Sequence, residues 1–189
     1  VVLHFGPVLQ RLNEAEFFEF CRLNADKRIE RSADGDLIVM PPTGGETGHR
    51  NFVLYRLFDD WAERDGSGIA FDSSTGFLLP NGALRSPDLA WITLDRWNKL
   101  SASQRKGFIP LSPDFVVELR SHSDSLSGLR AKMEEYRENG ARLGWLIDPT
   151  DRKIYLYDAN GETILDSPTS ISDDPVLPGF VMKLSRIWS

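Results

Sequence analysis

Two short apolar segments with an amphipathic segment between them constrain the fold of this chain more than any other feature. The apolar segments are PDFVVEL (residues 113–119) and LGWLIDP (residues 143–149). Such short, continuous apolar runs are typical of strands that are buried on both faces of a sheet. The segment between them predicts a helix from Leu126 or Leu129 to Asn139. Together they predict two adjacent parallel strands joined by a right-handed crossover.

Hairpins and further helices are expected in the rest of the chain. One hairpin is predicted over residues 28–40, with Gly35 in its turn, and another over residues 154–166. Helices are predicted after the N-cap Asn13 and after a Gly-rich loop at residues 41–49. These elements predict an α/β fold in which a mixed β-sheet carries helices on its faces.

The length and composition favour one soluble globular domain over residues 1–189. Hydrophobic residues make up 41% of the chain and charged residues 26%, which excludes wholesale disorder and a coiled-coil rod. The single cysteine, Cys21, excludes an intrachain disulfide and a zinc site of several thiolates. The sequence contains neither a run of about 18 apolar residues nor a basic segment before its first apolar residues. We therefore expect a cytoplasmic protein with no membrane partner.

The charge balance limits how the chain could meet nucleic acid. The net charge is −6, with 28 acidic and 22 basic residues. A chain with this charge does not coat nucleic acid by bulk electrostatic attraction. A local basic face is still compatible with it, as is a cluster of metal-binding carboxylates. The basic residues expected on such a face are Arg50, Arg85, Arg120, Arg130 and Lys132.

Two carboxylates in apolar strand segments are the main indication of a functional site. Glu118 lies at the carboxyl end of PDFVVEL, and Asp88 lies at the start of SPDLAWI (residues 86–92). An unpaired buried carboxylate costs on the order of several kcal/mol, so each requires a cation, a metal or a proton. Two carboxylates at strand ends favour a hard cation such as Mg²⁺. The structural alternatives are a salt bridge from Glu118 to Arg120 or another arginine, and a turn or cap at Asp88.

Lys132 lies in the predicted helix that follows Glu118 in the chain. A lysine on a helix is usually a solvated charge. Here the crossover brings the helix back over the sheet, so the long lysine stem can reach the strand end that carries Glu118. A lysine beside two carboxylates and a metal can orient or activate a water for attack on a phosphodiester.

Four segments, in order and spacing, resemble one known family. IERSADGDLIVMPPTGGETGH (residues 29–49) and SPDLAWI are followed by PDFVVELRSHSD (113–124) and LRAKMEEYRENGARLGWLIDP (129–149). Together they resemble the Uma-type family of restriction-endonuclease-like proteins, within the PD-(D/E)XK nuclease superfamily. The resemblance extends from about Leu12 to Trp188. It implies a restriction-endonuclease-like mixed sheet flanked by helices, and a phosphodiesterase site that uses Mg²⁺ or Mn²⁺.

The resemblance also implies roles for individual residues. Asp88 matches the aspartate of the Pro-Asp motif and Glu118 the acidic residue of the second motif, so both are expected to bind the metal. In this family the lysine has often moved from its original position, two residues after the glutamate, into the following helix. Lys132 matches the position in the helix and is expected to be catalytic. Arg120 stands at the original lysine position, and RSHSD departs from the residues that commonly follow the glutamate in this family.

Glu30 and His49 are two further catalytic candidates from the resemblance. Glu30 matches an acidic residue of the N-terminal hairpin that completes the metal site; its alternative is a solvent-facing residue paired with Arg28 or Arg50. His49 matches a histidine that begins the second helix, where it would contact a phosphate or a metal-bound water. The alternative for His49 is a surface or capping residue.

These expectations lead to a divalent-metal-dependent endonuclease that hydrolyses DNA phosphodiester bonds. Many nucleases of this superfamily act as dimers, so a homodimer is compatible with the sequence. Two alternatives stay open. One is a catalytically inactive, nuclease-like module that binds DNA or another protein, and the other is a structural protein in which arginines neutralise the strand-end carboxylates.

Overall fold

The computed structural model describes residues 1–3 and 12–189. The chain forms two compact units, and each is assembled from three separate stretches of sequence. The first unit comprises Val1–Pro42, Ser74–Ser86 and Leu100–Ser112, and the second comprises Thr43–Ser73, Pro87–Lys99 and Pro113–Ser189. In the described ranges, no helix is long and apolar enough to cross a bilayer.

The first unit is built on a five-stranded antiparallel sheet with the strand order β1-β3-β2-β6-β5. Phe17 on its first helix packs against Ile29, Leu37 and Leu84 from the sheet. The elements of this unit are β1 (Val2–Leu3), α1 (Glu14–Leu23), β2 (Arg28–Arg31), β3 (Leu37–Met40), β5 (Phe77–Leu78), β6 (Leu84–Arg85) and α4 (Ala102–Lys106).

Local sequence signals in the first unit act as predicted. The Asn13 side chain accepts the N–H of Glu16, and the Glu16 carboxylate accepts the N–H of Asn13, which closes a capping box at the start of α1. Gly35 has a φ of 90° in the turn between β2 and β3, a conformation that L side chains rarely adopt. Burial raises the pKa of the Cys21 thiol to about 11, which favours the protonated thiol at neutral pH.

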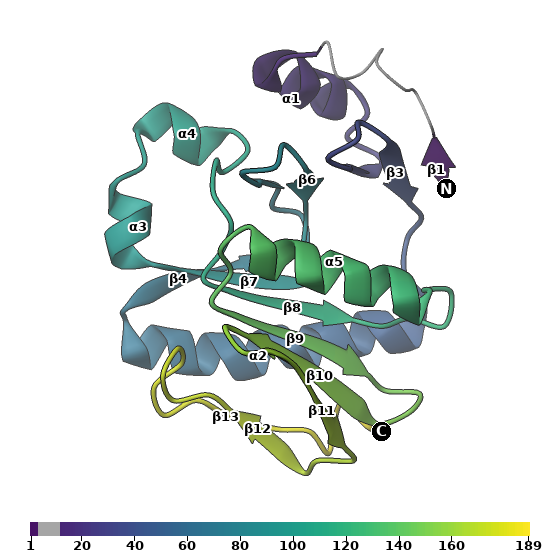
Figure 1. The fold of residues 1–189 in the computed structure, drawn as a ribbon, viewed down its shortest axis with the longest axis vertical. Coiled ribbons are helices and arrows are strands. Elements are labelled where there is room, and N and C mark those ends of the chain that lie inside the picture. The colour runs from purple at the N-terminus through teal and green to yellow at the C-terminus, as the bar shows by residue number, and fades with distance from the viewer. Residues whose placement is uncertain (4–11) are drawn as a thin grey trace. The chain divides into compact units, whose positions relative to one another are not determined.

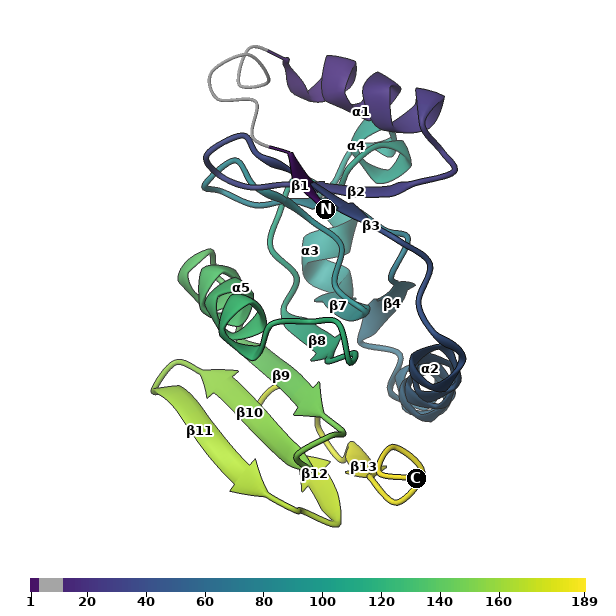
Figure 2. The ribbon, with the colours of Figure 1, turned by 90° about the vertical axis from the view of Figure 1, so that its right-hand side faces the viewer.

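The second unit is built on a six-stranded mixed sheet with the strand order β11-β10-β9-β8-β7-β4. Figures 1 and 2 show α5 on one face of this sheet and α2 on the other. Its helices and strands are α2 (Gly45–Asp65), β4 (Gly68–Asp72), β7 (Leu89–Thr93), α3 (Leu94–Asn98), β8 (Phe115–Leu119), α5 (Leu126–Glu138), β9 (Leu143–Asp148), β10 (Lys153–Asp158), β11 (Gly161–Asp166), β12 (Ser170–Ser172) and β13 (Val181–Lys183).

The predicted parallel strands and their crossover helix are confirmed. Strands β8 and β9 pair in parallel, with Glu118 opposite Leu146, and α5 connects them. Met133 of α5 packs against Gly144 of β9, where an added Cβ would lie only 2.5 Å from the Met133 Cε. A side chain at position 144 would therefore push α5 away from the strands that it covers.

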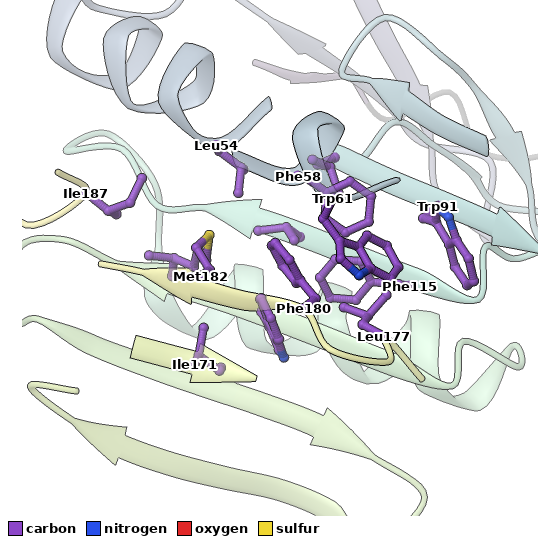
Figure 3. Close-up of a cluster of buried hydrophobic side chains, with 14 of the residues drawn as sticks. Leu54, Phe58, Trp61, Trp91, Phe115, Ile171, Leu177, Phe180, Met182 and Ile187 are labelled. Atoms are coloured by element: carbon purple, nitrogen blue, oxygen red, sulfur yellow. The ribbon is translucent and has the colours of Figure 1, made fainter. Parts of the chain in front are cut away.

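The opposite face of the sheet carries the main hydrophobic core. Alternate residues of β8 pack in one buried cluster with the apolar side of α2; they are Phe115, Val117 and Leu119. Figure 3 shows Phe180, from the C-terminal segment, among the rings of this cluster, and its centroid lies 5.2 Å from that of Phe58. The buried residues of that segment are Ile171, Leu177, Phe180, Met182, Leu184 and Ile187.

Two parts of the sequence-based description change. The Gly-rich segment is not a loop throughout residues 41–49, because α2 already begins at Gly45, after the extended N-cap Gly44. Glu46 in the first turn favours this earlier start, since a carboxylate there interacts with the positive end of the helix dipole. The strands β1, β6, β12 and β13 were not predicted, because two or three residues are too few to show a periodic pattern.

Candidate active site

Glu118 occupies the face of β8 that is covered by α5. Side chains alternate along a strand, and both neighbours of Glu118, Val117 and Leu119, belong to the core on the α2 side. Glu118 therefore points the other way, and only 4% of it is exposed. Glu118, the charged residue in the apolar segment PDFVVEL, is therefore a buried carboxylate.

Helix α5 supplies two partners to this carboxylate. The Nζ of Lys132 lies 2.7 Å from Oε1 of Glu118, and the Tyr136 hydroxyl donates to the same oxygen at 3.1 Å. Lys132 and Tyr136 are four residues apart, which puts them on the same side of the helix. The Lys132 side chain is 12% exposed, so this lysine is not a solvated surface charge.

Asp88 lies beside the same end of β8. It comes directly before β7, in which Leu89 is opposite Val117 of β8. The Oδ2 of Asp88 accepts the N–H of Leu119 at 2.8 Å, and the residue is 8% exposed. This hydrogen bond joins Asp88 to the neighbouring strand, so its contacts extend beyond a local turn or cap. The fold brings Asp88, Glu118 and Lys132 to one end of the sheet.

Arg120 does not neutralise Glu118, so the expected alternative of a salt bridge between them is wrong. Its Nη1 lies 2.6 Å from Oδ2 of Asp148, at the end of β9, and 3.8 Å from Asp151. Asp148 is fully buried, and its Oδ1 also accepts the N–H groups of Thr150 and Asp151. The hydrogen bond to Asp148 raises the pKa of the Arg120 guanidinium.

A second Pro-Asp dipeptide contains a buried carboxylate that sequence reasoning missed. Asp114 lies 3.0 Å from Nη1 of Arg96 and accepts hydrogen bonds from both the N–H and the hydroxyl of Thr93. It joins the end of β7 and the start of α3 to the beginning of β8. Asp114 and Glu118 are at opposite ends of β8, so only Glu118 can lie at the end that carries Asp88. The position along β8 is therefore the sequence signal that could have placed Asp114 outside the candidate site.

Glu30 lies in the first unit and is 2% exposed. Its Oε2 is 3.3 Å from Nη1 of Arg85, and its Oε1 accepts the N–H of Ser86 at 2.9 Å. The alternative of a solvent-facing residue is wrong, because Glu30 is buried. Arg28 donates to the carbonyl of Ser86, next to Arg85 in the chain. These contacts tie β2 to the end of the stretch Ser74–Ser86 in the same unit.

His49 is exposed to solvent, and the predicted basic residues contact other groups of the protein. His49 is exposed in the early part of α2, and no hydrogen bond or ion pair among the described residues joins it to Asp88, Glu118 or Lys132. The basic residues are engaged by protein partners: Arg50 by the carbonyls of Ile187 and Ser189, Arg85 by Glu30, Arg120 by Asp148, Arg130 by Glu162 and Lys132 by Glu118. Arg50 also lies 3.5 Å from Oε2 of Glu46, so each of these five cations has a carboxylate beside it.

A family model matches residues 14–185, which include most of both units. The model is Uma2, and its description is "Putative restriction endonuclease". This chain belongs to the Uma2 family. The match confirms the resemblance that the four sequence segments indicate.

A solved structure agrees with the fold of this Uma2 chain. It is the crystal structure of a "putative nuclease belonging to DUF820" from Anabaena variabilis, with a TM-score of 0.73 and 16% sequence identity. The likeness covers 86% of this chain and 90% of that chain. The fold is the restriction-endonuclease-like mixed α/β fold that the sequence predicts. A search of curated proteins found no match to this chain.

The residues of the site fit a divalent cation that keeps most of its water. In the part of the chain that the structure describes, no group of three or more His, Cys, Asp or Glu side chains forms a metal cage. Asp88 and Glu118 nevertheless provide two buried carboxylates at one sheet end. Mg²⁺ is usually held by one or two carboxylates together with several waters. A two-carboxylate site in this Uma2 protein thus suits Mg²⁺ or Mn²⁺ better than Zn²⁺, which prefers nitrogen and sulfur ligands.

Proposed function

We propose that this Uma2 protein is a divalent-metal-dependent endonuclease that hydrolyses DNA phosphodiester bonds. The observation that carries the proposal is the 2.7 Å contact of Lys132 with Glu118, beside Asp88, at one end of a restriction-endonuclease-like sheet. An ion pair between neighbouring residues of one hairpin would be local and would say little about function. Here a lysine from the crossover helix and carboxylates from two strands come together.

Asp88 and Glu118 would hold Mg²⁺ or Mn²⁺. When bound, the cation would supply a Lewis acid for the scissile phosphate and would lower the pKa of a coordinated water. The hydrogen bond from the Leu119 N–H to Asp88 fixes the orientation of one carboxylate. The Tyr136 hydroxyl, which donates to Glu118, does the same for the other. Both carboxylates are thus oriented by groups of the fold.

Lys132 would orient the attacking water or stabilise the negative charge that develops on the phosphate. A cation aimed at the position where charge develops is effective in a site with little water, and Lys132 is largely buried. Glu30 and His49 are proposed as supporting catalytic residues on the family resemblance alone. The expected partner is DNA, and a cytoplasmic location and a homodimer stay part of the proposal.

Metal-dependent nicking of supercoiled plasmid DNA tests this function. The wild-type protein should nick the plasmid with MgCl₂ or MnCl₂ and not with EDTA. Glu118→Gln should reduce the rate by about 100-fold or more, because it removes a metal ligand. Glu134→Gln is the matched control, since this glutamate lies on α5 and pairs with Arg137 outside the site. Equal rates for Glu118→Gln and the wild type would refute the assignment.

A second candidate function is a nuclease-like module that binds DNA or another protein without cutting. The observation that favours it is the compensation of Arg120 by Asp148, because this arginine occupies the original lysine position of the motif. Calorimetric titration with MnCl₂ separates the two candidates. An active site should bind the metal in wild type and lose that binding in Glu118→Gln, whereas an inactive module should show no carboxylate-dependent binding.

A further inference from the structure

A pocket of about 400 Å³ in the second unit is lined by the middle of α2, by β4 and by Leu89 of β7. Aromatic rings form much of its wall: Phe52, Tyr55 and Phe58 from α2, and Phe71 from β4. Phe52 is 65% exposed, which is unusual for so large an apolar side chain. The Tyr55 hydroxyl accepts the N–H of Ser73 at 3.3 Å, which holds its ring in place. The volume is in the range of small-molecule sites.

The polar residues of the pocket favour a neutral ligand with several hydrogen-bonding groups. Arg56, Asp59 and Asp72 line the pocket together with the rings. Two carboxylates beside one guanidinium do not suit an isolated anion. A nucleobase offers donors and acceptors along its edge and two faces that stack on aromatic rings. Of the ligands that a nuclease meets, an unstacked base fits this lining best.

The position of the pocket connects it with the candidate active site. Leu89 lines the pocket and comes directly after Asp88, and it pairs with Asp72 of β4, another lining residue. The pocket therefore lies at the sheet end that carries Asp88 and Glu118. Leu89 belongs to the core on the α2 side, so the pocket is on the face opposite Glu118. A base could reach it only by leaving its stack and turning over the end of the sheet.

We propose that this pocket binds an unstacked nucleobase next to the phosphate held at Asp88 and Glu118. The inference rests on the proposed nuclease function, because that function supplies a nucleic-acid strand at this end of the sheet. Phe52 forms the exposed stacking surface, and Tyr55 and Phe71 form the inner walls. Arg56, Asp59 and Asp72 contact the edge of the base. The protein would thus select strands whose bases can be extruded.

Binding of short single-stranded DNA in EDTA tests this pocket without cleavage. The probes are an oligonucleotide that contains 2-aminopurine and the same strand with an abasic position in its place. The wild type should bind the 2-aminopurine strand at least about 5-fold more tightly and quench its fluorescence through stacking. Phe52→Ala should abolish both effects, and Phe52→Trp should keep them. Ile164→Ala, at another exposed apolar residue of the same unit, should leave both unchanged.

Four outcomes are decisive: two come from these binding measurements, one from sedimentation and one from plasmid cleavage. Equal affinity of the wild type for both strands, or equal behaviour of Phe52→Ala and Ile164→Ala, would overturn the base pocket. A dimer in sedimentation that Phe52→Ala dissociates would overturn it too, because Phe52 would then be covered by a second copy. A base preference without Mg²⁺-dependent cleavage would support the pocket and overturn the proposed catalysis.

Discussion

Glu118 and Asp148 are buried carboxylates near the carboxyl ends of adjacent parallel strands, yet the protein satisfies them differently. Asp148 interacts with the Arg120 guanidinium through one oxygen and with two backbone N–H groups of the following turn through the other. Glu118 is contacted through one oxygen by Lys132 and Tyr136, two side chains of a helix that crosses the sheet. The contacts of Asp148 stay at the ends of β8 and β9, whereas those of Glu118 join the sheet to helix α5.

The partners of the two carboxylates differ in how freely they can move. Backbone amides and a planar guanidinium are fixed donors, so Asp148 and Arg120 form a rigid pair. A lysine ammonium is a compact charge on a flexible stem, so Lys132 can move when a cation binds next to Glu118. Arg120 at the original lysine position thus serves the β9 end, so a lysine for the β8 end has to come from the helix, as Lys132 does.

The largest effect on stability is expected at Asp148. Asp148→Asn should lower the free energy of unfolding by about 3 kcal/mol, because it leaves the Arg120 charge without its buried partner. Mg²⁺ binding should not change. Urea unfolding and calorimetry measure the two quantities. Asp151→Asn is the control, with an expected change of less than about 0.5 kcal/mol, since this carboxylate is 53% exposed and 3.8 Å from Arg120. Loss of Mg²⁺ binding in Asp148→Asn would remove the distinction between the two pairs.

Much of the fold and the centre of the candidate site could be predicted from the sequence. The apolar runs around residues 116 and 145 determine two buried strands, and the handedness of the crossover places α5 over them. The approach of Lys132 to Glu118 follows from that topology and from the length of a lysine stem.

The remaining contacts depend on strand register and on distant segments. Arg120 meets Asp148 because its N–H bonds to the carbonyl of Ile147, which no local pattern reveals. The role of Asp114 depends on the position of Arg96 in a short helix. The burial of Phe180 depends on the C-terminal segment folding back onto α2. Each of these requires the tertiary structure.

Lys132→Met should reduce catalysis strongly. Methionine keeps most of the apolar stem but leaves Glu118 without its ammonium partner. Nicking should fall by about 100-fold, the usual size of the loss when one charge-stabilising group is removed. MgCl₂ should raise the melting temperature of the variant more than that of the wild type, because the cation replaces the missing positive charge. Thermal unfolding in MgCl₂ and in EDTA measures this difference. An identical metal response in both proteins would mean that Glu118 is not a metal ligand.

Arg120→Lys tests whether the original motif position can take over from Lys132. Alone, it should cost about 1 kcal/mol of stability, because lysine cannot reproduce the guanidinium geometry at Asp148. Combined with Lys132→Met, it should not restore nicking, since Asp148 would hold the new lysine at the β9 end. Plasmid nicking by the single and double variants decides this. Recovery of activity in the double variant would show that the two strand ends are interchangeable.

The smallest effect is expected from Tyr136→Phe. It removes one hydroxyl donor from the buried Glu118 and should cost about 1 kcal/mol of stability. Nicking should slow only a few-fold, because Lys132 still contacts the carboxylate. Tyr157→Phe removes a hydroxyl that donates to Glu162, so it should also cost stability but leave nicking unchanged. Urea unfolding and nicking rates measure both variants. If both affect nicking equally, Tyr136 only supports the fold; a slower rate in Tyr136→Phe alone would make it a positioning residue for Glu118.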